Sequence, residues 1–90
     1  MREIEEQEIE KLFDYVTARV KEERKKRKIS QLKLALLLGH NSTSYVARIE
    51  LRQDGANYNL GHLYIIAKEF GMEMGEFLPG VGNDEGLTGL

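Results

Sequence analysis

Residues 30–50, SQLKLALLLGHNSTSYVARIE, constrain the fold more than any other part of the chain. Ser30 and Ser42 are good helix N-caps, because a short side-chain oxygen can accept hydrogen bonds from the free N–H groups of a first helical turn. Gly39 lies between them and readily takes the left-handed conformation that ends a helix. The stretch therefore predicts two short helices joined by a tight turn, over residues 31–38 and 43–51.

Helical patterns continue on both sides of this stretch. Apolar residues recur at helical spacing near the start of the chain, at Ile9, Leu12, Phe13, Val16 and Val20. They predict one long amphipathic helix over residues 4–27. Asn59 can cap a fourth helix over residues 60–70, and a short fifth helix over 74–78 would stop before Pro79.

No segment shows the alternation of a half-buried strand, so we expect an all-α fold of five helices. Ninety residues suit a single domain, and a composition that is 41% hydrophobic and 31% charged allows a modest core. The glycine-rich end of the chain has almost no apolar pattern. We expect an N-terminal helical extension over 1–15, the domain proper over 16–79 and a flexible tail over 80–90.

The net charge of −2 hides a segregation of charge along the chain. Residues 15–52 carry ten basic and three acidic side chains, a net charge of +7, and acidic segments flank them on both sides. A basic block can be no more than a solvated surface, or it can favour a polyanionic partner. The choice between these readings depends on the neighbouring residues.

Several functional classes lack support in the sequence. The chain has no Cys and only two His residues, His40 and His62, so we expect no metal site and no cofactor. No apolar run approaches the roughly 18 residues of a membrane span, and the acidic N-terminus does not resemble a signal peptide. No Ser-His-Asp set, glycine-rich phosphate loop or carboxylate pair indicates an enzyme. We expect a cytoplasmic protein that is not an enzyme.

The start of the predicted helix over 43–51 is suited to the major groove of DNA. Short polar side chains such as Thr43 and Ser44 let a helix end approach base edges closely, and Val46 with Ile49 can seat the rear face on the preceding helix. Arg48 faces outward beside them, and arginine often reads guanine. Thr43 and Ser44 are otherwise ordinary capping residues.

The same residues carry a resemblance to a known family. Residues 30–50 resemble the helix-turn-helix of the phage lambda repressor and Cro family, also called the XRE family. The stretches NLGHLYIIAKEFG and MEMGEFL are similar to its fourth and fifth helices, so that the resemblance covers roughly residues 16–79. The matching positions are Ser30-Gln31, Leu34-Ala35, Gly39 and Ile49-Glu50.

This resemblance implies a five-helix, lambda-repressor-like domain that binds double-stranded DNA sequence-specifically, typically as a homodimeric repressor. One alternative is an antitoxin that uses the same fold to repress its own operon and binds a toxin protein. Another is a protein-interaction adaptor that has kept the fold and lost DNA binding.

The resemblance also implies roles for individual residues. Arg48 would read a base, Arg52 would bind phosphate, and Tyr45 would donate to a phosphate or pack on a sugar. Gln31 would touch phosphate or support the recognition helix. An ion pair between Arg24 and Glu50 would hold the first helix to the third. The full set expected to bind DNA is Gln31, Asn41, Ser42, Thr43, Ser44, Tyr45, Arg48 and Arg52.

Leu32 and Leu36 lie four residues apart on one helical face, where the family generally carries polar residues. Exposed apolar patches commonly mark an interface. Either the long first helix covers this pair or a partner does, and a second copy of the chain is the expected partner. The extension over residues 1–15, with Ile4, Ile9 and Phe13, is the other candidate for a dimer interface.

Overall fold

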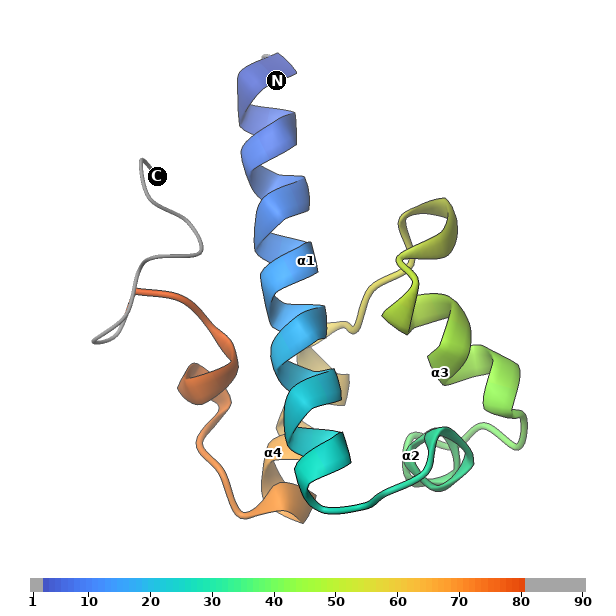
Figure 1. Cartoon of the computed structure of the whole chain (residues 1–90). Helices are drawn as coiled ribbons and strands as arrows, with labels where there is room; N and C mark the ends of the chain where they lie inside the picture. The colour runs from blue at the N-terminus through green and yellow to red at the C-terminus, as the bar shows by residue number, and fades with distance from the viewer. Residues whose placement is uncertain (1–2, 81–90) are drawn as a thin grey trace.

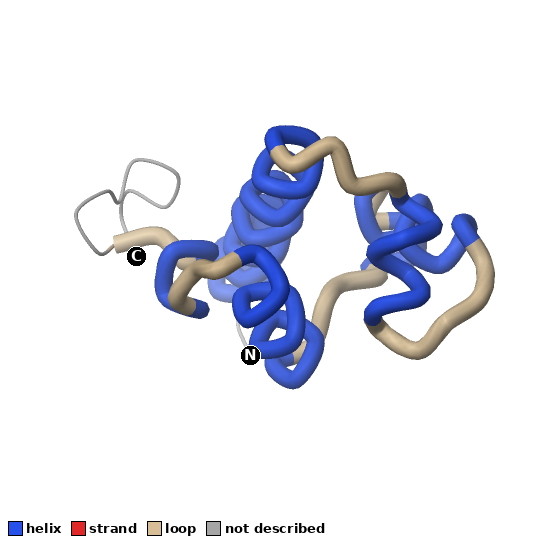
Figure 2. The backbone as a smooth tube through the Cα atoms, turned by 90° about the horizontal axis from the view of Figure 1, so that it is seen from below, coloured by secondary structure: helices blue, strands red, loops and turns tan. Residues whose placement is uncertain are grey.

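The computed structural model describes residues 3–80, and every regular element in this range is helical (Figure 2). The all-α prediction is therefore confirmed. Residues 81–90, which make up nearly all of the predicted flexible tail, lie outside the described residues. The elements are four α-helices, α1 (Glu3–Lys26), α2 (Gln31–Leu37), α3 (Thr43–Glu50) and α4 (Leu60–Phe70), and two short 3-10 helices, η1 (Gln53–Gly55) and η2 (Met74–Phe77).

The short fifth helix predicted over residues 74–78 is present as the 3-10 helix η2, so the structure has four α-helices among the described residues rather than five. Gly71 ends α4 and the next helix begins only at Met74, so Pro79 leaves room for little more than one helical turn. The tighter 3-10 bonding suits so short a segment, and Glu73 and Glu76 form a capping box at its start. Phe77 still enters the core, as the apolar pattern requires.

The core draws on every long element of the fold. α1 packs against α3 and η2, α2 packs against α3 and α4, and α4 packs against η2 (Figure 1). The largest fully buried side chains come one from each of these elements and belong to a single core cluster: Val20, Leu34, Val46, Ile66 and Phe77.

The local signals around the predicted turn are confirmed. The Ser30 hydroxyl accepts a hydrogen bond from the backbone N–H of Lys33 at 3.0 Å, and the Ser42 hydroxyl accepts one from Ser44 at 3.2 Å. Gly39 takes a φ of 88°, in the left-handed region that favours glycine. The turn between α2 and α3 is thus set by residues within it.

α1 continues without interruption through the boundary expected at residue 15. Its first half projects past the rest of the bundle (Figure 1). Val16 and Val20 lie in the core, and Leu12 is partly buried against it. The extension is therefore the first half of a single helix whose second half is part of the core.

Candidate nucleic-acid interface

The start of α3 is open to solvent and free of acidic side chains. Asn41, Ser42, Thr43 and Ser44 are all exposed, and no acidic residue lies in the first turn. The hydroxyls of Ser42 and Ser44 are 2.7 Å apart, so they form one hydrogen-bonded pair at the helix N-terminus. The positive end of the helix dipole lies at the same place, which makes this end favourable for anions.

The opposite face of α3 is buried against α2. Val46 and Ile49 belong to the same core cluster as Leu34 and Ala35 of the preceding helix. Their β-branched side chains are rigid, so they fix the distance and rotation of α3 relative to α2. The expected helix-turn-helix packing is present.

The predicted pair of Arg24 and Glu50 is present and buried. The Arg24 Nε donates to Glu50 Oε2 at 2.7 Å and its Nη2 donates to Oε1 at 3.1 Å, while the two side chains are only 9% and 3% exposed. Arg24 also donates to the carbonyl of Ile29 at 2.7 Å. This forked geometry connects the end of α1 to the end of α3.

Of the two roles expected for Gln31, phosphate contact and support of the recognition helix, the structure shows a contact of the supporting kind. Its Nε2 donates to Glu50 Oε1 at 2.8 Å, so the carboxylate receives bonds from both α1 and α2. Buried Tyr58 lies near the same pair, and burial together with the negative charge of Glu50 raises the pKa of its hydroxyl.

Tyr45 is partly buried between two histidines. The ring of His40, from the α2–α3 turn, stacks on the Tyr45 ring at a centroid distance of 3.5 Å. The Tyr45 hydroxyl lies 3.4 Å from Nε2 of His62 on α4. These contacts hold the turn, α3 and α4 together, so Tyr45 is tied to protein groups at the position where a phosphate contact was expected.

Arg48 is available on the surface. Its side chain is 55% exposed, and its nearest carboxylate, on the exposed residue Asp54, is 3.8 Å away. An exposed ion pair of this length contributes little. The guanidinium can therefore leave Asp54 for a stronger acceptor at small energetic cost.

Arg52 is placed differently from the phosphate ligand that was expected. Its guanidinium folds back onto α1, where it bonds to Glu10 and lies 3.6 Å from Asp14 Oδ1, and its side chain is only 12% exposed. Nothing in the local sequence indicated these partners, because they lie far away in the chain. We therefore do not assign phosphate binding to Arg52.

Three cations of the basic block share one buried carboxylate, which the sequence did not reveal. Glu23 is buried and accepts from three cations, Arg27 at 2.7 Å, Arg19 at 3.0 Å and Lys26 at 3.2 Å. The hydrogen bond from Arg27, with help from the other two cations, lowers the pKa of Glu23 from 4.5 to about 2. Arg27 also donates to the carbonyl of Phe70 at 2.9 Å.

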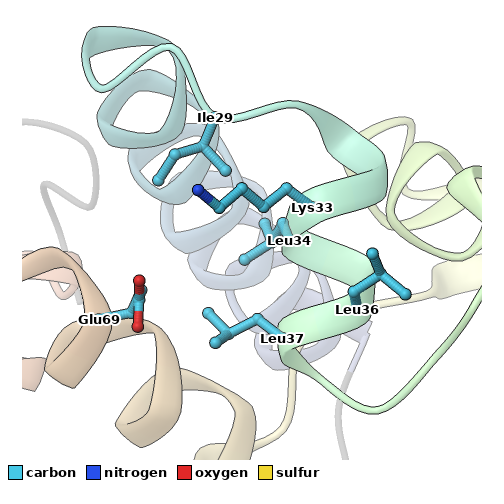
Figure 3. Close-up of a pocket in the computed structure, with 6 residues that line it drawn as sticks. All are labelled: Ile29, Lys33, Leu34, Leu36, Leu37 and Glu69. Carbon is cyan, nitrogen blue, oxygen red and sulfur yellow. The ribbon is translucent and has the colours of Figure 1, made fainter.

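Leu32 and Leu36 are 42% and 55% exposed, so α1 does not cover them. Beside them, α2 and α4 border an apolar groove of about 350 Å³. Figure 3 shows Leu37 pointing across this groove toward Glu69, with Leu36 at its rim.

The described residues hold no group of three potential metal ligands, and no helix among them has the length and apolarity to cross a membrane.

Comparison with known proteins agrees with this geometry. Residues 20–77 match a protein family described as helix-turn-helix, a span that contains α2, α3, α4 and part of α1. Neither a curated protein nor a solved structure gives a significant match to the chain. The resemblance seen in the sequence is confirmed by the family match. The chain belongs to the XRE-type helix-turn-helix family of DNA-binding transcription regulators.

Proposed function

We propose that this protein is a sequence-specific repressor that inserts the N-terminal end of α3 into the major groove of double-stranded DNA. The observation that carries the proposal is the exposed, carboxylate-free front of α3 on a helix whose rear face is buried. Asn41 and Ser42 would contact phosphates, and Thr43 and Ser44 would contact base edges. A repressor of this kind would act in the cytoplasm, where the DNA is accessible.

Arg48 is the residue proposed to discriminate most strongly between bases. It is exposed on the same helix and only weakly paired with Asp54. A guanidinium that forks onto guanine O6 and N7 contributes about 1–3 kcal/mol of discrimination against the wrong base. Gln31 would act indirectly, because its amide supports Glu50 and thereby the end of α3.

We further propose that two copies bind a two-fold symmetric site with half-sites about 34 Å apart, one turn of DNA. Leu32 and Leu36 are the preferred interface, because α1 leaves them exposed. The apolar residues Ile9 and Phe13 of the projecting half of α1 are the other candidate, and the side chain of Ile4 lies outside the described part of the structure.

The test is selection of bound duplexes from a random pool, followed by anisotropy titrations of the selected duplex and a random duplex at two salt concentrations. We expect an inverted repeat, and affinity that falls as salt rises because bound phosphates release counterions. Arg48→Ala should lower the preference for the selected duplex by about 1–3 kcal/mol and leave the melting temperature nearly unchanged.

Lys68→Ala is the matched control, because it also removes one positive charge from an exposed site and Lys68 lies beside Tyr64 on α4. It should leave the discrimination between duplexes unchanged. Absence of binding to any duplex at either salt concentration would contradict the proposal and favour the adaptor. A selected site without two-fold symmetry would contradict the homodimer.

A further inference from the structure

Two neighbouring residues at the end of α3 reach back to α1 at two separate places. Glu50 bonds to Arg24 near the end of α1, and Arg52 bonds to Glu10 and lies beside Asp14 in its first half. Asp14 and Arg24 are about 15 Å apart along the helix axis, from the rise of an α-helix. Two separated attachment points constrain the angle of α3 to α1 more tightly than either one alone.

The surroundings of Arg52 are those of a held side chain. Its guanidinium carbon lies 5.3 Å from the centroid of the Phe13 ring, and two carboxylates of the same helix flank it. Its Nε and Nη1 atoms are buried and have no hydrogen-bond partner among the described residues. A guanidinium buried against α1 in this way is not presented to a duplex.

The backbone at Arg52 supports the same conclusion. Its φ of 51° and ψ of 34° place it in the left-handed region, which residues other than glycine seldom adopt. This conformation follows directly after α3 and leads the chain into η1. A conformation of this kind persists where the surrounding contacts hold it. Here the backbone of Arg52 bonds to Ile49 and Gly55, and its side chain is held by α1.

We propose that Arg52 is a positioning residue, which acts with Glu10, Phe13 and Asp14 as a latch that sets the angle at which α3 meets DNA. The first half of α1 then supports α3 in the orientation in which it would contact DNA. This inference rests on the proposed function of α3 in reading DNA. It differs from the phosphate-binding role expected of Arg52, and the two roles give opposite results in the same measurements.

The test is a mutant cycle on the full chain, with Arg52→Gln, the double variant Glu10→Gln/Asp14→Asn, and all three changes together. Affinity for the selected duplex is measured at several salt concentrations, well below the melting temperature. The control is Glu6→Gln/Glu8→Gln, which removes the same charge from two α1 carboxylates that have no ion-pair partner among the described residues. Thermal unfolding without DNA is recorded for every variant.

We expect Arg52→Gln to weaken binding about threefold to tenfold, a usual coupling between contacting groups. The Glu10/Asp14 variant should weaken it similarly relative to the control, although fewer carboxylates would by themselves tighten DNA binding. The triple variant should be no weaker than Arg52→Gln. The slope of log affinity against log salt should stay at the wild-type value, because the latch contacts no phosphate.

A slope that falls by about one in Arg52→Gln, with no loss in the Glu10/Asp14 variant, would identify Arg52 as a phosphate ligand and overturn the proposal. Equal affinities for all variants would also overturn it. If the wild-type chain binds no duplex, the proposed function fails and the positioning role fails with it. Thermal unfolding of the same variants then shows separately whether Arg52 contacts Glu10 and Asp14. If the stability changes of Arg52→Gln and of the Glu10/Asp14 variant simply add in the triple variant, the contact is excluded.

Discussion

The first turn of α3 exposes Thr43 and Ser44, whereas its last turn buries Ile49 and the carboxylate of Glu50. Hydroxyls at the open end have water as an alternative partner, so they are available to a ligand. The carboxylate at the closed end bonds to both Arg24 and Gln31, so it is fixed in place. A helix that reads DNA therefore needs one end that is free and one end that is rigidly held.

The greatest loss of stability should come from removing the buried ion pair between Arg24 and Glu50 at the C-terminal end of α3. Glu50→Ala should destabilise the protein by about 3–5 kcal/mol, because it leaves the buried charge of Arg24 without its partner. The measurement is urea unfolding at neutral pH. Glu69→Ala is the control, since Glu69 is exposed, and it should change stability by less than about 0.5 kcal/mol. Equal losses for the two variants would show that the pair does not hold α3.

A smaller effect is expected at the open end. Ser42→Ala should lower the unfolding free energy by about 1 kcal/mol, because the Ser42 hydroxyl caps α3. Ser42→Asp should retain the cap and most of the stability, yet weaken duplex binding, because a carboxylate would then face phosphates. Unfolding and anisotropy titrations measure the two outcomes. A stability loss for Ser42→Ala as large as that for Glu50→Ala would contradict the proposed difference between the N-terminal and C-terminal ends of α3.

The smallest expected effect is a pH dependence at the contact between α3 and α4. The pKa of His62 is lowered, first by burial and then by the proximity of His40. Its Nδ1 accepts from the backbone N–H of Asn59 at 3.2 Å, so the neutral ring completes the capping box of α4. A depressed pKa contributes stability that is present above about 6.5, the unfolded value, and is lost as pH falls through the folded value.

His62→Gln tests this, because glutamine at the same position of a capping box can accept the same bond without titrating. Between pH 7.5 and 5.5 the wild-type protein should lose more stability than the variant, by less than about 1 kcal/mol, the scale of one capping interaction. If the urea midpoints of the wild-type protein and of His62→Gln changed by the same amount across this pH range, the role of His62 would be contradicted.

The parts of the fold that could be predicted from sequence are those set by local interactions. Ser30, Ser42 and Asn59 each cap a helix through bonds to residues two or three positions away, and Gly39 has its left-handed conformation in the turn where it was expected. The buried pair of Arg24 and Glu50 is long-range, and only the family resemblance indicated it. The short helix predicted at η2 is present, but the apolar pattern did not indicate its 3-10 type, because so short a helix shows the same pattern as an α-helical turn.

The contacts that could not be predicted join residues that are distant in the chain. The basic block suggested a surface for phosphates, but three of its cations pair with Glu23, and Arg27 also donates to the carbonyl of Phe70. Arg52 turned back to Glu10 and the Tyr45 hydroxyl lies beside His62, each across many residues. The charges and their spacing in the sequence indicate which side chains are present, but they do not indicate which ion-pair or hydrogen-bond partner each side chain has in the fold.

The helix ends and the polar face of α3 follow from the sequence alone, because capping and apolar periodicity act over a few residues. Which cations stay available depends on the packing of the helices, which leaves Arg48 exposed and holds Arg52 against α1. An arginine pairs with whichever carboxylate the packed helices bring near it, and that proximity exists only after the helices have packed together.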